Sequence, residues 1–137
     1  LAVTADDLVG FAMQWEGPEN AATPLLGLHR MGEAPLLCEA PLEDELLMKG
    51  YAGSIAFSGI GTEVGITSPK GGRVQVFSDA GEALYSVARA DVCGLGPSLT
   101  ADFLVTDGAG LSAEISATGL TPCERVAVAW DNHLITL

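Results

Sequence analysis

The sequence has few positive charges and no long hydrophobic run. Over 137 residues, 6 Lys and Arg stand against 18 Asp and Glu, which gives a formal net charge of −12. Such a surface repels the phosphate groups of nucleic acids and of anionic lipids, so we expect no nucleic-acid partner. No apolar run approaches the roughly 20 residues that a membrane-spanning helix needs, and the sequence therefore predicts no transmembrane segment.

Cysteine is also scarce, with only Cys38, Cys93 and Cys123. Because their number is odd, they cannot all pair within one chain, and either one bridge or three reduced thiols remains open. This count favours a reducing compartment but does not fix the localisation. No two cysteines form a CxxC pair, and His29 and His133 are distant in the sequence. We therefore expect no metal site and no cofactor.

Charged residues as a whole are also few, at 18%, while hydrophobic residues make up 48%. An ordinary soluble domain carries about 25% charged residues, so this chain has less polar material to cover its surface. A protein partner or self-association would cover the remainder. The length fits a single domain over residues 1–137, which is large enough to bury its own core.

A first short helix is expected at about residues 5–16. Thr4 is a suitable N-cap residue, and Gly17-Pro18 is typical of a helix end. Apolar residues recur at spacings of three and four and would form one face; they are Leu8, Phe11, Ala12 and Trp15. The segment that follows, up to residue 24, has the composition of a loop.

A second short helix is expected at about residues 42–49. Pro41 precedes it, three acidic residues at 43–45 fall in its first turn, and Gly50 follows it. This arrangement matches the dipole of a helix, because carboxylates favour the amino end and Lys49 would favour the carboxyl end. The acidic cluster is therefore interpreted as a helix start and not as a catalytic pair.

The rest of the chain is expected to form β-strands. Two candidate strands cover about 25–31 and 36–39, and from residue 53 onward apolar and polar residues alternate with a period of two. Turn residues divide this region, about 53–137, into four hairpins: 54–58 with 62–67, 73–78 with 82–90, 99–106 with 111–118, and 125–130 with 133–137. The hairpins share only this period, which gives no ground for an internal repeat.

These patterns predict a mainly β fold, an antiparallel hairpin meander that closes as a sandwich or a barrel. The sequence does not separate these two closures. None of the local motifs predicts a catalytic, cofactor-binding or metal-binding residue. The glycine-rich stretch at 59–65 is typical of a β-turn, and Asp131 and Asn132 are common turn residues beside His133.

The sequence favours a non-enzymatic structural or protein-interaction domain that is a subunit of a larger assembly. The candidate partner contact comprises Phe77, the nearby Arg73, and Trp15 on the first expected helix. A buried Phe77 is the alternative for that residue. Two other functions remain open: a small β-barrel or sandwich that encloses an apolar ligand, and an enzyme whose catalytic residues are dispersed along the chain.

Overall fold

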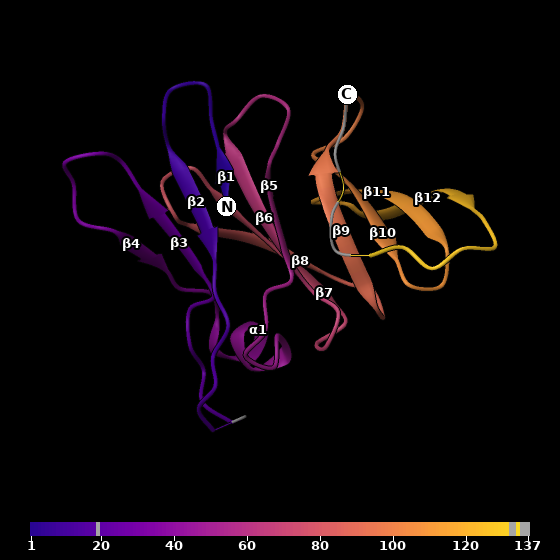
Figure 1. Ribbon diagram of the computed structural model, residues 1–137, viewed down its shortest axis with the longest axis horizontal. Helices are drawn as coiled ribbons and strands as arrows, with labels where there is room; N and C mark the ends of the chain where they lie inside the picture. Colours follow the sequence, from indigo (N-terminus) through magenta and orange to yellow (C-terminus); the bar gives the residue numbers. More distant parts are fainter. Residues whose placement is uncertain (19, 132–133, 135–137) are drawn as a thin grey trace.

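The computed structural model describes residues 1–18, 20–131 and 134, and this part of the chain is mainly β (Figure 1). It contains three four-stranded antiparallel sheets and one short helix. Each sheet is built from four strands that are consecutive in the sequence. We call them the first sheet (β1–β4), the second sheet (β5–β8) and the third sheet (β9–β12).

The strand bounds follow the chain in order. The first sheet comprises β1 Ala2–Val3, β2 Val9–Ala12, β3 Leu26–His29 and β4 Leu36–Cys38. The helix α1, Leu42–Leu47, connects it to the second sheet, which comprises β5 Ser54–Phe57, β6 Glu63–Ser68, β7 Arg73–Ser78 and β8 Ala83–Ala88. The third sheet comprises β9 Val92–Pro97, β10 Phe103–Asp107, β11 Leu111–Ser116 and β12 Gly119–Arg125.

The three sheets repeat one plan. In each, the strands lie side by side in chain order, and each strand is antiparallel to its neighbours. The sheets stack face to face in the order first, second, third, and the first strands approach one another, β1 to β5 and β5 to β9 (Figure 1). The sequence left a sandwich and a barrel open, and the described residues form no closed barrel. The repetition of a four-stranded sheet along the chain was not expected from the sequence.

Two hydrophobic cores lie between the stacked sheets. The core between the first and second sheets is contributed by residues from both, including Leu26, Leu28, Cys38, Val64, Ile66 and Phe77. The core between the second and third sheets includes Val74, Val76, Leu95, Phe103, Val105 and Ile115. The second sheet is thus covered on both faces, which explains why its central strands are apolar on both sides.

A glycine on the second strand lets each pair of sheets approach closely. On β2, a Cβ atom at Gly10 would lie 3.1 Å from Cδ1 of Ile55, and on β6, one at Gly65 would lie 2.9 Å from Cδ2 of Leu95. Ile55 and Leu95 both belong to the first strand of the next sheet. The same interlock of a bulky side chain over a glycine therefore joins the first sheet to the second and the second to the third.

Three polar contacts join the second and third sheets. The Tyr85 hydroxyl donates to Oδ2 of Asp102 at 2.6 Å, and Oγ1 of Thr67 donates to the carbonyl oxygen of Cys93 at 2.7 Å. The Arg89 guanidinium also donates to the buried carboxylate of Asp107. Burial, followed by the bond to Asp102, raises the pKa of Tyr85 above its ordinary value.

The helix expected at residues 5–16 is wrong, because Val9–Ala12 is strand β2, paired with both β1 and β3. Asp7 has a φ of 64°, which no first turn of a helix accommodates. Thr4 closes a tight turn by accepting a hydrogen bond from Leu8 N–H at 3.0 Å. Val9 and Phe11 also alternate with Gly10 and Ala12, a period of two that favours a strand, and pairing with β3 decided between the two structures.

The helix expected near 42–49 is confirmed as α1, although it ends two residues earlier. Oε1 of Glu45 accepts a hydrogen bond from Ala40 N–H at 3.0 Å and so satisfies a donor just before the helix. Lys49 lies beyond the last turn, with a φ of 51°, so it does not neutralise the helix end. No helix in the described part of the chain has the length and apolarity needed to cross a membrane.

The first three expected hairpins are confirmed as β5/β6, β7/β8 and β10/β11, and the strands expected near 25–31 and 36–39 correspond to β3 and β4. The fourth is wrong: β12, Gly119–Arg125, pairs with β11, and residues 126–130 are not a strand. Positions 133 and 135–137 of that hairpin lie outside the described residues. Strand β9 was not expected, because its two glycines interrupt the alternation of apolar and polar residues.

We expect Gly65→Val to destabilise the protein by about 1–3 kcal/mol, because the new side chain would overpack the glycine interlock against Leu95. Urea unfolding of the variant and the wild type measures this loss. Ala88→Val is the matched control, since Ala88 is an exposed residue on strand β8. Equal unfolding midpoints for the two variants would show that the close approach at Gly65 is not a packing constraint.

We expect stability to fall at alkaline pH through Tyr85. Its pKa in the folded protein lies above the ordinary value of 10.0, so the neutral phenol is favoured by folding. The stabilisation is complete below pH 10.0 and is lost as the pH rises above it. Denaturant unfolding between pH 8 and 11 should therefore show a steeper loss for the wild type than for Tyr85→Phe, and parallel curves would contradict the assignment.

Candidate functional site

The face of the first sheet that points away from the second sheet carries apolar side chains. In each strand of the first sheet, successive side chains point to opposite faces of the sheet. One face packs into the core through Leu26 and Leu28, and the other points outward. We call this surface the apolar outer face and define it by Val3, Val9, Phe11, Gly27, His29 and Leu37. Each of the four strands contributes at least one of these residues, because alternate side chains of a strand lie on the same face of the sheet.

An aromatic ring lies across the centre of this face. Phe11 on β2 is directly opposite Gly27 on β3, and a Cβ atom at Gly27 would lie only 2.1 Å from Cζ of Phe11. The ring therefore occupies the space that a side chain at Gly27 would take. This contact holds Phe11 flat on the sheet and leaves it half-buried.

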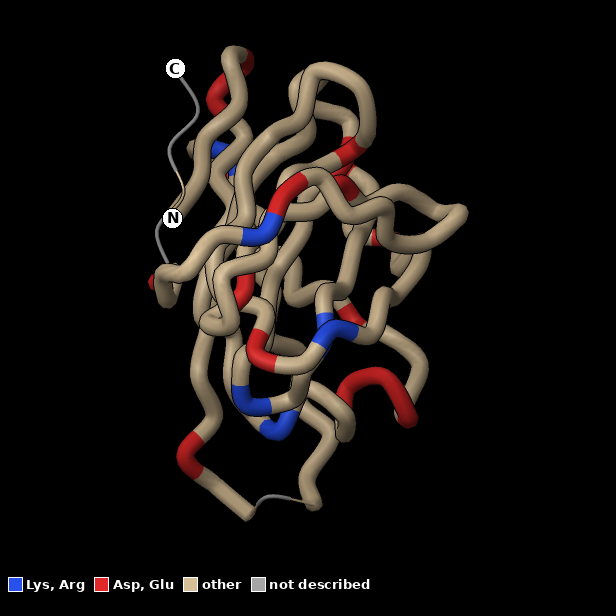
Figure 2. Tube along the Cα trace, turned by 90° about the vertical axis from the view of Figure 1, so that its right-hand side faces the viewer, with Lys and Arg blue, Asp and Glu red and all other residues tan. Residues whose placement is uncertain are grey.

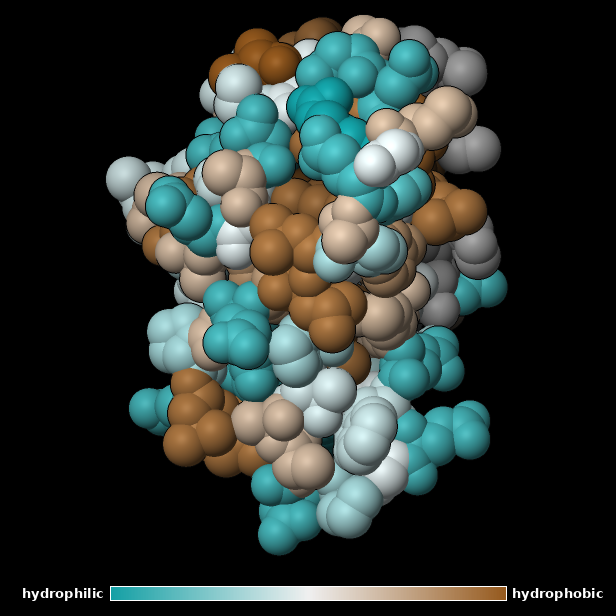
Figure 3. Space-filling model, turned by 90° about the vertical axis from the view of Figure 1, so that its left-hand side faces the viewer, coloured by the Kyte–Doolittle hydropathy of each residue, from teal (hydrophilic) through white to brown (hydrophobic). Residues whose placement is uncertain are grey.

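The apolar outer face is open to solvent at two of its six residues, and Val9, Phe11 and His29 are half-buried. Val3 is 60% exposed and Leu37 is 53% exposed. Figure 3 shows hydrophobic residues gathered in the middle of this side of the molecule, with hydrophilic residues around them. Among the described residues, Nδ1 of His29 on this face is buried without a hydrogen-bond partner. An apolar centre with a polar rim is the usual composition of a protein interface.

The outer face of the third sheet is different. Its outward side chains alternate with the core residues and are mostly polar; they include Leu104, Thr106, Ser112 and Glu114. The chain after β12 also returns to this face, because a Cβ atom at Gly94 would lie 3.2 Å from Cβ of Leu134 and 3.4 Å from the carbonyl oxygen of Asp131. The two ends of the stack therefore offer chemically different surfaces.

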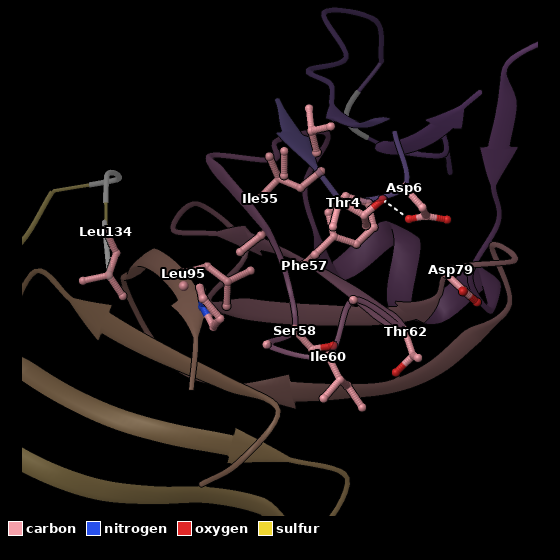
Figure 4. A pocket seen from close by; sticks show the side chains of 18 residues that line it. Thr4, Asp6, Ile55, Phe57, Ser58, Ile60, Thr62, Asp79, Leu95 and Leu134 are labelled. Atoms are coloured by element: carbon pink, nitrogen blue, oxygen red, sulfur yellow. Dashed lines mark hydrogen bonds between the residues drawn. The ribbon is translucent and has the colours of Figure 1, made fainter. Parts of the chain in front are cut away.

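A groove of about 820 Å³ runs along the first strands of the three sheets (Figure 4). It is lined by residues of β1 and the turn after it, by the end of β5 and the turn at 58–62, and by the end of β9. Its carboxylates are Asp6 and Asp79, and no Lys or Arg is among its lining residues. The groove is open and has both polar and apolar walls.

The carboxylate of Asp6 is held by groups that belong to the fold. Oγ1 of Thr4 donates to it at 2.5 Å, and Nη2 of Arg30 lies 2.8 Å from its Oδ2. The hydrogen bond from Thr4, followed by that from Arg30, holds the pKa of Asp6 below its ordinary value. Asp6 is therefore ionised at neutral pH and ties the turn after β1 to Arg30 beyond β3.

Charges are dispersed over the surface. Figure 2 shows acidic positions spread along the trace, and they do not gather in one patch. Arg73 lies 3.3 Å from Asp44, and the other ion pairs noted above involve Arg30 and Arg89. In the described ranges, no three His, Cys, Asp or Glu side chains are grouped closely enough to hold a metal ion.

The structure does not bring the three candidate contact residues together. Phe77 is only 1% exposed and packs in the core between the first and second sheets, so it offers no surface to a partner. Arg73 is engaged by Asp44 and by Oγ of Ser86 at 2.9 Å. Trp15 is 43% exposed and lies against Gly17. That Trp15 and Arg73 contact a partner stays a prediction.

Sequence reasoning missed the apolar outer face because it assigned Val9 and Phe11 to a helix. The signal was present: Val9 and Phe11 alternate with the small residues Gly10 and Ala12, which is typical of a strand with one bulky face. The turn expected at Asp131 and Asn132 cannot be checked, because Asn132 and His133 lie outside the described residues.

The three cysteines are free thiols, with Cys38 and Cys93 buried and Cys123 exposed on β12. Burial raises the pKa of Cys38 to about 11 and also raises that of Cys93. Because the thiolate is the reactive form, we expect one thiol to react rapidly with Ellman's reagent in the native protein and three after unfolding. Cys123→Ser should remove the rapid phase; a rapid phase that persists in this variant would contradict the burial of the other two.

The comparison with known proteins is limited to the family level. No curated protein matches the chain by sequence. One family model, described as "Protein of unknown function (DUF1513)", matches residues 1–137, the full length of the chain. That description assigns no activity, substrate or partner. The chain therefore belongs to the DUF1513 family.

Proposed function

We propose that the chain is a non-enzymatic structural and protein-interaction domain, that it works as part of a larger assembly, and that it docks through the apolar outer face. The observation that carries this proposal is the exposure of Val3 and Leu37 on a sheet face whose other large side chains are Val9 and Phe11. Monomeric proteins rarely expose a contiguous apolar patch of this kind unless it binds something.

The energetics favour docking at this face. Full burial of a Val or Leu side chain contributes roughly 1.5–3 kcal/mol relative to leaving it in water. Val3 and Leu37 are more than half exposed, so most of that gain is still available to a partner. The Phe11 ring is already fixed against Gly27, so little conformational entropy is lost when it is covered.

The groove along the first strands supports a second function, the binding of a small ligand. Its volume of about 820 Å³ is large enough for a small molecule. A carrier of apolar ligands requires an enclosed and mostly apolar cavity. The groove is open and includes the carboxylates of Asp6 and Asp79, so the geometry supports this function less well than docking at the apolar outer face.

We expect the wild type to associate or to bind the neutral dye Nile red, and the double variant Val3→Lys/Leu37→Lys to lose both properties. Both positions are exposed, so the substitutions cost the fold little. A neutral dye avoids repulsion by the net charge of −12. Light scattering against the calculated 14.1 kDa and dye fluorescence measure the two properties.

The matched control is Leu84→Lys/Leu99→Lys, which adds the same charge at positions that are 46% and 104% exposed on other surfaces. It should associate and bind dye as the wild type does. A wild type that is monomeric and binds no dye would contradict the proposed function. Loss of dye binding on Ile60→Lys alone would instead favour the groove, which Ile60 lines.

A further inference from the structure

Each sheet has two faces of different composition near its first two strands. In the second sheet, the face toward the first sheet carries Ile55, Phe57, Val64 and Ile66, whereas the face toward the third sheet carries Ser54, Ala56, Gly65 and Thr67. Bulky side chains thus point toward the preceding sheet and small ones toward the following sheet. We call these the bulky face and the small-residue face.

The same direction holds in the neighbouring sheets. The first sheet turns Ala2, Gly10 and Ala12 toward the second sheet, and the third sheet turns Leu95, Phe103 and Val105 toward it. Each contact in the stack therefore joins a small-residue face to a bulky face. Gly10 receives Ile55, and Gly65 receives Leu95, as the two interlocks show.

The apolar outer face is the bulky face of the first sheet. Its first two strands carry Val3, Val9 and Phe11, in positions that correspond to the bulky residues of β5 and β6. In the second and third sheets, this face is covered by the small-residue face of the sheet before it. In the first sheet it is exposed, with Val3 60% accessible.

Resting on the proposed function, we infer that the occupant of the apolar outer face is a further four-stranded antiparallel sheet of the same repeat. It would present its small-residue face, with Gly or Ala on its first two strands, opposite Val3 and Phe11. Four-stranded sheets that stand with their first strands toward a common axis form a β-propeller, which typically closes with four to eight blades. The three sheets seen here would be consecutive blades, and the groove along β1, β5 and β9 would be part of the wall of the central channel.

A second copy of residues 1–137 fits this face poorly. Its two small-residue faces of the required kind are already covered inside the stack. The third sheet has Leu104 on the outward side of β10 where β2 and β6 have Gly10 and Gly65, and Asp131 and Leu134 lie against Gly94. Two apolar outer faces placed together would oppose bulky side chains with no glycine pocket to receive them except Gly27, which Phe11 already occupies.

The test is photo-crosslinking from the centre of the face in the protein expressed in its native cells. Phe11 is replaced by p-benzoylphenylalanine, which preserves the aromatic ring, and the crosslinked peptide is identified by mass spectrometry. The control carries the same group at Leu99, which is 104% exposed and belongs to no sheet. We expect Phe11, and not Leu99, to crosslink to a strand that carries Gly or Ala within a four-stranded antiparallel sheet.

A second measurement covers the case in which the crosslinker disturbs docking. In the assembled protein, Val3→Asp should lower the Tm by on the order of 5 °C, because a carboxylate would be buried against an apolar sheet, whereas Leu99→Asp should leave the Tm unchanged. A crosslink to the apolar outer face of a second copy, or to a helix or loop of another protein, would overturn the inference and leave the proposed function standing. No crosslink together with an unchanged Tm for Val3→Asp would overturn both.

Discussion

The fit of a bulky side chain over a glycine on the neighbouring sheet is the contact on which the structure depends. At Gly10 and Gly65 the absence of a side chain lets Ile55 and Leu95 fill the space between sheets. Protein interiors are packed as densely as organic crystals, so a sheet of four short strands is stable only if its faces match those of its neighbours at this scale. The repeated interlock sets the order and the direction of the stack.

The polar contacts are arranged around this packing. Tyr85 with Asp102, and Arg89 with Asp107, join the second and third sheets at residues where buried polar groups find partners. Although burial alone would raise the pKa of Asp107, hydrogen bonds from Leu111 N–H and Arg89 hold it below its ordinary value. These contacts fix the position of one sheet on the next, while the apolar cores supply most of the driving force.

The apolar outer face is a direct consequence of the same repeat. Because the three sheets point the same way, one end of the stack is the bulky face of the first sheet, and the other end is the outer face of the third sheet. At the third sheet, polar residues lie on the terminal face, and Asp131 and Leu134 lie against Gly94. At the first sheet, Val3 and Leu37 remain exposed, and this asymmetry connects the fold to its proposed role in an assembly.

The sequence by itself determined the β class, the antiparallel hairpins from residue 54 to 116 and the helix near 42–47, because period-two alternation and turn residues act locally. The tertiary structure alone decided that Val9–Ala12 is a strand, that Phe77 is buried and Val3 exposed, and that the strands form three sheets. This segment carries both an apolar spacing of three and four, which favours a helix, and an alternation of bulky and small residues, which favours a strand, and pairing with β3 separates the two. Whether an apolar face is buried or exposed depends on contacts with residues distant in the sequence, so the local sequence pattern does not predict it.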